Sequence, residues 1–345
     1  MRSRSSLSSR TSADALLRRR FDALGLARPR RAKLTRAIAQ LNRELRARDI
    51  RLSPHFWFSN EWFSPDGVPG IAIPFYLAHA NLERLERRMS GFAEGGDVES
   101  LMRILRHEAG HAVDTAYRLR RRALWRKTFG APGRHYPSSY TALPRSRDFV
   151  QHLDDWYAQS HPAEDFAETF AVWLVPGSRW RSSYRGWPAL RKLEVMEQLM
   201  ASIRGRKPAL HTTRRIDSLA RSRRTLDSHY AEMRRRRARR NYSLVSERLG
   251  AAFVTVAEAE ARGRSARPAA AFLSTHRRRL LRLLDRQVAL SVYSARQLLD
   301  VAVEWCREHD LQLCGTTRIA VAHADRFVLR IARAAARGGK LRFPL

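Results

Sequence analysis

The sequence predicts an α+β domain followed by a mostly helical, strongly basic region. Between residues 50 and 76, short aromatic and β-branched runs are separated by Pro, Gly and Asp-Gly, a pattern typical of a small sheet. On both sides of this interval apolar residues recur at helical spacing, for example from residue 13 to residue 48. After Trp187 the spacing stays helical, and the intervals 280–299 and 319–335 carry arginine on their polar side.

Length and charge suggest how the chain is divided. Its 345 residues, 44% of them hydrophobic, suffice for one large domain or two modest ones. We expect a flexible basic tail over residues 1–12, a first folded domain over residues 13–204, and a basic helical C-terminal region over residues 205–345.

Positive charge is the strongest compositional feature. Lys and Arg total 66 against 33 Asp and Glu, which gives a net charge of +33. Such a charge indicates an acidic partner for the C-terminal region, either an acidic peptide or a nucleic acid. The densest block is Met233–Tyr242, yet no known nucleic-acid-binding motif accompanies it. The alternative, that these arginines only solvate helix faces, stays open.

Cysteine content and apolar runs bear on location. Cys306 and Cys314 are the only cysteines, too few for a disulfide scaffold. No apolar run approaches the roughly 20 residues of a membrane span. The basic N-terminus lacks the apolar core of a secretory signal. The expected location is therefore the cytoplasm.

The most informative motif is His107-Glu108-Ala-Gly-His111. On a helix, residues four apart lie on one face, so the two imidazoles can hold one metal ion. Glu108 lies about 100° further round the helix, where it can act as general base on a metal-bound water. Asp97 or Ser100 is placed to cap this helix. A motif that fixes three positions also occurs by chance, and a catalytic zinc needs a third protein ligand.

A segment free of cations supplies candidates for that ligand. From Asp148 to Ser178 there is no Lys or Arg, and six carboxylates lie in this interval. Ser160 or His161 can cap a helix that starts near Pro162, which places Glu164 and Glu168 one turn apart. One carboxylate can bind the metal while the other accepts the remaining N–H of a ligand histidine.

These two motifs together carry a resemblance to a known family. His107-Glu-Ala-Gly-His111-Ala-Val-Asp114 with Glu164-Asp-Phe-Ala-Glu168 resembles the glutamate-liganded zinc peptidases, the gluzincins. Within them it is most similar to the catalytic domain of anthrax toxin lethal factor and to a set of bacterial zinc-binding metallopeptidases. The resemblance covers about residues 50–175 and implies a zincin-like catalytic domain, so that residues 13–204 would form the metallopeptidase domain.

The resemblance also implies residue roles. Glu164 becomes the third zinc ligand, and Tyr157, seven residues earlier, polarises the substrate carbonyl. Tyr136 and Tyr140, on the preceding loop, are the alternative donors. Glu168 is expected to support a ligand histidine, and Asp114 either supports His111 or is purely structural.

The function expected from these features is zinc-dependent hydrolysis of a peptide or protein substrate, with Glu108 as general base. Two alternatives stay open. One is a basic helical nucleic-acid-binding protein whose zinc site is structural or inactive. The other is an amidase that acts on a non-peptide substrate.

Overall fold

The structure is a computed structural model that describes residues 12–90, 92–136, 140, 142–143, 145–250, 253–261, 266–288, 290 and 292–336. The side chains of Asp155, of residues 236–244 and of residues 292–293 are not described. The tail predicted over residues 1–12 therefore lies outside the described residues except for Ser12, as do most side chains of the 233–242 arginine block.

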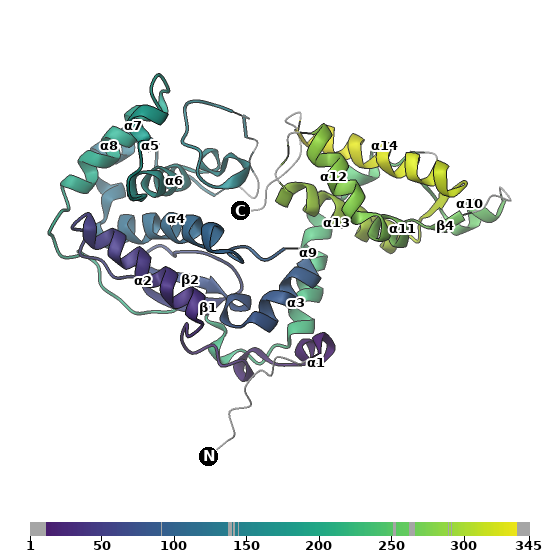
Figure 1. The fold of residues 1–345 in the computed structure, drawn as a ribbon, viewed down its shortest axis with the longest axis horizontal. Coiled ribbons are helices and arrows are strands. Elements are labelled where there is room, and N and C mark those ends of the chain that lie inside the picture. Colours follow the sequence, from purple (N-terminus) through teal and green to yellow (C-terminus); the bar gives the residue numbers. More distant parts are fainter. Residues whose placement is uncertain are drawn as a thin grey trace, which may run out of the picture. The chain divides into compact units, whose positions relative to one another are not determined.

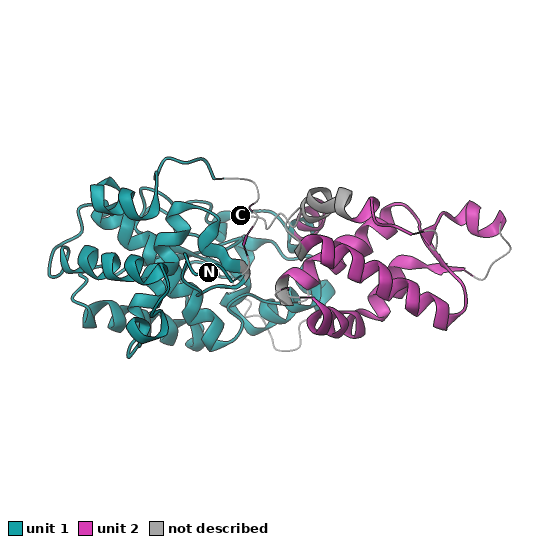
Figure 2. Cartoon of the chain, turned by 90° about the horizontal axis from the view of Figure 1, so that it is seen from above, with its two compact units in different colours: residues 1–136, 144–229 teal, residues 137–143, 230–345 magenta. Residues whose placement is uncertain are grey.

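The chain forms two compact units (Figure 2). Unit 1 comprises residues 1–136 and 144–229, and unit 2 comprises residues 137–143 and 230–345, in their described parts. Residues 205–229 group with unit 1, and the sequence-based domain limits at 204 and 205 stay a prediction.

Unit 1 consists of helices around a two-stranded sheet. Its described helices are α1 (Ala13–Leu17), η1 (Phe21–Ala23), α2 (Ala32–Ala47), η2 (Phe75–Ala78), α3 (Ala80–Ser90), α4 (Val98–Tyr117), η3 (Leu119–Arg121), α5 (Ala123–Phe129), η4 (Asp154–Gln159), α6 (Pro162–Leu174), α7 (Trp180–Ser183), α8 (Ala189–Ala201) and η5 (Leu219–Arg221), where η marks a 3-10 helix. Its strands are β1 (His55–Ser59) and β2 (Gly70–Pro74).

The sheet of unit 1 is parallel, with His55 opposite Gly70 and Ser59 opposite Pro74. At Gly70, the start of β2, a Cβ would lie 2.3 Å from the His55 ring, so a larger residue there would displace that ring. Residues of the 205–229 segment line β1: the Trp57 indole donates to the carbonyl of Ile216 (2.7 Å), and the Ser59 hydroxyl donates to that of Asp217 (2.9 Å). These bonds explain why the segment groups with unit 1.

Helix α4 is the centre of unit 1. In Figure 1 it lies between α6 on one side and α2 with the sheet on the other, in agreement with the contacts of these elements. The predicted cap is confirmed, because the Ser100 N–H donates to Oδ1 of Asp97 (2.8 Å). The helix ends at Arg118, whose backbone is left-handed (φ 53°).

Unit 2 has its own hydrophobic core. Its elements are most of α9 (Leu226–Ser246), then β3 (Phe253–Val254), α10 (Val256–Ala261), β4 (Ala266–Pro268), α11 (Ala269–Thr275), α12 (Arg277–Gln287), α13 (Val292–Glu308), β5 (Gln312–Cys314) and α14 (Thr317–Ala336). The three short strands form an antiparallel sheet in the order β3-β5-β4. Fully buried residues such as Leu280, Leu299 and Phe327 hold the helices together.

The predicted α+β class is confirmed. Two details differ from the sequence analysis. The amphipathic interval 280–299 is divided between α12 and α13, with α12 ending at Val288 in an extended conformation. The small sheet of unit 2 was not predicted. Among the described residues, no helix is long and apolar enough to span a membrane.

Candidate metal centre

The helix that carries the His-Glu-x-x-His motif is buried along its active face. His107, Glu108 and His111 all lie in α4, and each is less than a tenth exposed. Between the two histidines, Gly110 faces α6, where a Cβ would lie 2.9 Å from the Cα of Ala167. Gly110 thus permits a close approach of α4 and α6, which brings side chains of both helices to one point.

The second helix of the site is α6. Its N-cap is His161, whose Nδ1 accepts a hydrogen bond from the N–H of Ala163 (3.1 Å), and Pro162 occupies the first turn. Glu164 and Glu168 follow one turn apart and are almost completely buried. Both therefore point from α6 towards α4.

Three predicted ligands converge. Oε2 of Glu164 lies 3.0 Å from Nε2 of His107 and 3.1 Å from Nε2 of His111, and the two Nε2 atoms are 3.2 Å apart. Tetrahedral nitrogen and oxygen ligands at about 2.0–2.1 Å from zinc lie about 3.3 Å from one another. The three lone-pair atoms thus have the mutual spacing that a zinc ion needs, and among the described residues they form the group suited to hold a metal.

Glu168 contacts the opposite nitrogen of the same ring. Nδ1 of His107 lies 2.8 Å from Oε1 of Glu168, and the N–H of Leu153 donates to the other oxygen, Oε2 (2.8 Å). With its proton on Nδ1, His107 presents the lone pair of Nε2 to the centre of the site. The predicted carboxylate pair therefore contacts both nitrogens of one imidazole.

The electrostatics of the site follow from burial and proximity. Burial alone would raise the pKa of Glu164, but His111 and His107 hold that pKa well below its ordinary value. Burial disfavours the charged form of His107, yet the carboxylates of Glu164 and Glu168 raise its pKa well above the ordinary value. The carboxylate of Glu164 thus stays ionised and attracts positive charge, which protons on the imidazoles or a bound cation can supply.

Glu108 is not one of the three converging ligands. Its Oε2 atom is buried and has no hydrogen-bond partner among the described residues. Burial raises the pKa of this carboxyl, which moves it towards the range in which a carboxylate is an effective base. An unpartnered buried carboxylate oxygen costs stability, so it indicates a group that bound water or substrate would satisfy.

Two tyrosines lie near the ligands. The ring centroid of Tyr157 is 5.5 Å from that of His107. The hydroxyl of Tyr136 donates to Oε1 of Glu164 (2.9 Å), and its ring stacks on His161 at 3.7 Å between centroids. Burial and the Glu164 carboxylate raise the pKa of Tyr136, so the phenol keeps its proton. Tyr140 groups with unit 2.

Asp114 contacts Arg120 instead of a histidine ring. Oδ1 accepts from the backbone N–H of Arg120 and Oδ2 from its side chain, both at 2.8 Å. Arg120 also pairs with Asp66 (2.6 Å). These contacts fix the turn after α4, and the supporting role of Asp114 towards His111 stays a prediction.

Sequence reasoning missed two residues of the site. His161 is predicted only as a cap, yet its ring also stacks on Tyr136, and its Nε2 lies 2.8 Å from the carbonyl oxygen of Arg134. His152, on the loop before η4, lies 2.9 Å from the carbonyl oxygen of Arg103 in α4. No local sequence pattern predicts these contacts, because each joins segments that are far apart in the chain.

Comparison with known proteins agrees with this centre. A family described as "Putative zinc-binding metallo-peptidase" matches residues 72–178, which include both α4 and α6. No curated protein and no solved structure matches the chain. The family match supports a zinc-binding metallopeptidase, and it overlaps most of the interval of about residues 50–175 that carries the predicted resemblance.

Proposed function

We propose that this protein is a zinc-dependent peptidase of the glutamate-liganded type, in which His107, His111 and Glu164 bind the metal. The observation that carries this proposal is the triangle of ligand atoms with edges of 3.0, 3.1 and 3.2 Å. The resemblance to gluzincins and the zinc-binding family match support it.

Zinc, when bound, supplies Lewis acidity towards a carbonyl and lowers the pKa of a water molecule. The protein supplies the remaining groups. Glu108 has a free buried carboxylate oxygen beside the ligands and is the general base that takes a proton from water and then donates it to the leaving amine. Glu168 holds the proton on Nδ1 of His107 and so keeps Nε2 available as a ligand.

The tetrahedral intermediate of peptide hydrolysis carries negative charge on the former carbonyl oxygen, and a phenol can stabilise it. Tyr157 is the donor that the family resemblance implies. Tyr136 has a geometric argument of its own, because its hydroxyl touches a metal ligand and its side chain is 41% exposed, so that a substrate can reach it. We assign the main role to Tyr157 and treat Tyr136 as the competing candidate.

The proposal is tested by metal content and activity together. Purified protein should contain about one zinc per chain and cleave members of a peptide mixture, as detected by mass spectrometry. A chelator should abolish cleavage, and added zinc should restore it. Glu108→Gln should keep the zinc, but its rate of cleavage should be roughly 10²- to 10⁴-fold lower, because the amide cannot accept a proton.

Two results would contradict this function. Equal turnover by Glu108→Gln would remove Glu108 from the mechanism. A wild-type protein that holds zinc but cleaves no peptide would instead indicate the structural zinc site of the alternative, nucleic-acid-binding hypothesis.

A further inference from the structure

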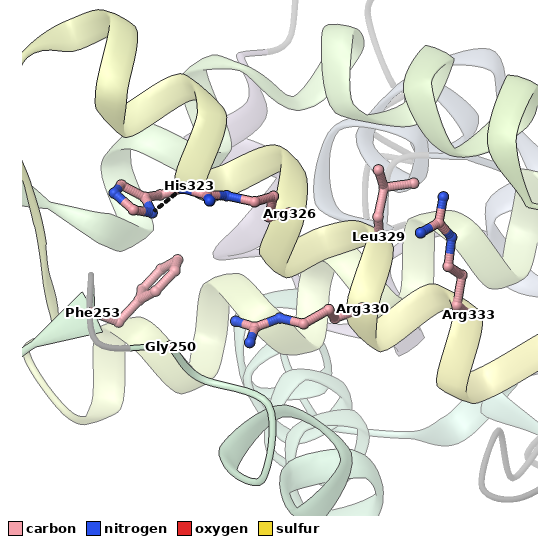
Figure 3. Close-up of a pocket in the computed structure, with 7 residues that line it drawn as sticks. All are labelled: Gly250, Phe253, His323, Arg326, Leu329, Arg330 and Arg333. Carbon is pink, nitrogen blue, oxygen red and sulfur yellow. Dashed lines mark hydrogen bonds between the residues drawn. The ribbon is translucent and has the colours of Figure 1, made fainter.

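Unit 2 contains a pocket of about 370 Å³ on one side of α14 (Figure 3). This volume falls within the range of small-molecule sites, roughly 300–1,000 Å³. Its walls come from α14, from Gly250 and from Phe253, the first residue of β3. The lining residues are Gly250, Phe253, His323, Arg326, Leu329, Arg330 and Arg333.

Three arginines give the pocket its charge. Arg326, Arg330 and Arg333 follow one another at helical spacing, so they share one face of α14. At 1.5 Å per residue their Cα atoms span about 10 Å along the helix. All three are exposed. None of the ion pairs formed by described residues includes them, and the neighbouring Asp325 is paired with Arg279 instead. Their positive charge is therefore not neutralised within the described structure.

Most of the surface that lines the pocket is apolar. Phe253 packs against Phe327 of α14, with ring centroids 4.6 Å apart, and Leu329 lies on the same helix between the arginines. In Figure 3 the Phe253 ring and the Arg330 side chain point into the same space. A ligand that fills the pocket would contact guanidinium groups and an aromatic side chain together.

One hydrogen bond positions Arg326, and Gly250 leaves room for the side chain of Arg330. Arg326 donates a hydrogen bond to Nδ1 of His323 (2.9 Å). This bond requires a neutral imidazole with its proton on Nε2, so the Nε2–H of His323 can still donate to a ligand. The guanidinium of Arg330 lies over Gly250, where a Cβ would come within 2.8 Å of Nη2. A side chain at position 250 would displace this guanidinium.

From this geometry we propose that the pocket binds an organic phosphate of the nucleoside di- or triphosphate class, with the phosphate chain along the three arginines and the apolar body against Phe253 and Leu329. Planar guanidinium groups bind phosphate oxygens through paired hydrogen bonds, and three in a row match a chain of phosphates better than a single carboxylate. The pocket is half open, and its volume of about 370 Å³ matches a small ligand better than an extended polyanion. All lining residues belong to unit 2, so this site is independent of the metal centre.

Isothermal titration of the full-length protein with ATP tests the proposal, with pyrophosphate and adenosine as partial ligands. We expect one saturable site for ATP, weaker binding of pyrophosphate, and the weakest binding for adenosine. Arg330→Gln should weaken ATP binding about 10-fold or more, the usual effect of a charge-assisted hydrogen bond. Arg318→Gln is the matched control, because Arg318 is an exposed arginine of the same helix outside the pocket.

Gly250→Ala provides a test that leaves the charge unchanged. The added methyl would shift the flexible end of Arg330, so ATP binding should weaken less in this variant than in Arg330→Gln, while circular dichroism reports an intact fold. No saturable ATP binding, or equal weakening by Arg318→Gln and Arg330→Gln, would overturn the proposal. So would binding of a single-stranded oligonucleotide that is tighter than ATP binding and equally weakened by Arg318→Gln and Arg330→Gln, which would indicate a diffuse positive surface.

Discussion

The imidazole of His107 lies between two carboxylates, with Nδ1 2.8 Å from Oε1 of Glu168 and Nε2 3.0 Å from Oε2 of Glu164. Because the carboxylates are one turn apart on α6, a single helix contacts both nitrogens of the ring. Glu164 is thereby placed to bind a metal ion together with Nε2 of His107. Glu168 holds the proton on Nδ1, the tautomer that leaves the lone pair of Nε2 available.

Glu168→Gln tests this division of roles. The amide keeps the volume of the side chain but weakens the hold on the Nδ1 proton, so we expect zinc affinity to fall by roughly 10- to 100-fold. Competition with a chromophoric chelator measures the change. Glu99→Gln, at an exposed position of α4, is the control and should leave the affinity unaltered. Unaltered affinity in Glu168→Gln would make this carboxylate a purely structural group.

The identity of the third ligand can be tested with neighbouring residues. Glu164→Gln should strip most of the zinc, because it removes the charged oxygen from the ligand triangle. Asp165→Asn should keep the metal, since Oδ2 of Asp165 accepts from Lys192 on α8 (2.7 Å), away from the site. Metal analysis of both variants decides the assignment. Zinc retained in Glu164→Gln and lost in Asp165→Asn would show that the ligand has been assigned to the wrong residue.

Local signals in the sequence were sufficient to predict the two helices of the site. The Asp97 cap, the His161–Pro162 start and the spacing of His107, His111, Glu164 and Glu168 are all properties of short segments. Such signals specify where a helix begins and ends and which residues share a face. Two residues four positions apart on one helix lie side by side in any fold.

Other features depend on contacts between distant segments. The stacking of Tyr136 on His161 joins a long loop to a helix start, and loops have no periodicity from which to infer position. The strands of unit 2 span only two or three residues, for example Phe253–Val254, too few to show an alternating pattern. Residues 205–229 contact β1 through hydrogen bonds from side chains of the strand to backbone carbonyls of the segment. No change in amino-acid composition predicts these contacts.

Helix spacing at the site is tested by Gly110→Ala. The added methyl would lie 2.9 Å from a backbone atom of α6, so α4 and α6 must separate by a few tenths of an ångström. We expect a loss of about 1–3 kcal/mol in the free energy of unfolding and weaker zinc binding. Urea unfolding with and without zinc measures both effects. Gly133→Ala is the control, since a Cβ there meets nothing within 4 Å. Equal stability of the two variants would show that helix contact at Gly110 does not limit the site.

The buried carboxylate of Glu83 pairs with three cations, so part of the protein's stability should be lost in acid. Burial alone would raise the pKa of Glu83, but hydrogen bonds from Arg87, Arg31 and Lys33 lower it from 4.5 to about 2. Lys33 also donates to the carbonyl of Gly96, at the turn before α4. Because the folded state binds this proton less tightly than the unfolded state, the stabilisation is complete above pH 4.5 and is lost as the pH falls to about 2.

Glu83→Gln should therefore lower the free energy of unfolding at pH 7 by about 2 kcal/mol, a value reduced for the solvent screening of half-exposed Arg87. Urea unfolding of both proteins at pH 7 and at a pH of about 2, the folded-state pKa, measures the difference, which should shrink at the lower pH. A difference that stays constant between the two pH values would show that the stabilisation does not depend on the charge of Glu83.

The tyrosine that stabilises the oxyanion is identified by removing one hydroxyl at a time. Tyr157→Phe keeps the ring that lies 5.5 Å from His107, so packing and zinc content should be preserved. We expect kcat to fall by roughly 10- to 1,000-fold with little change in KM, because the hydroxyl acts only on the charge that develops in the transition state.

Tyr136→Phe removes the hydrogen bond to Oε1 of Glu164 and should change zinc affinity more than kcat of the zinc-saturated enzyme. Kinetics at saturating zinc separate the two effects. If kcat holds in Tyr157→Phe and collapses in Tyr136→Phe, the phenol in contact with the metal ligand is the oxyanion donor, and the role implied by the family resemblance does not transfer to this protein.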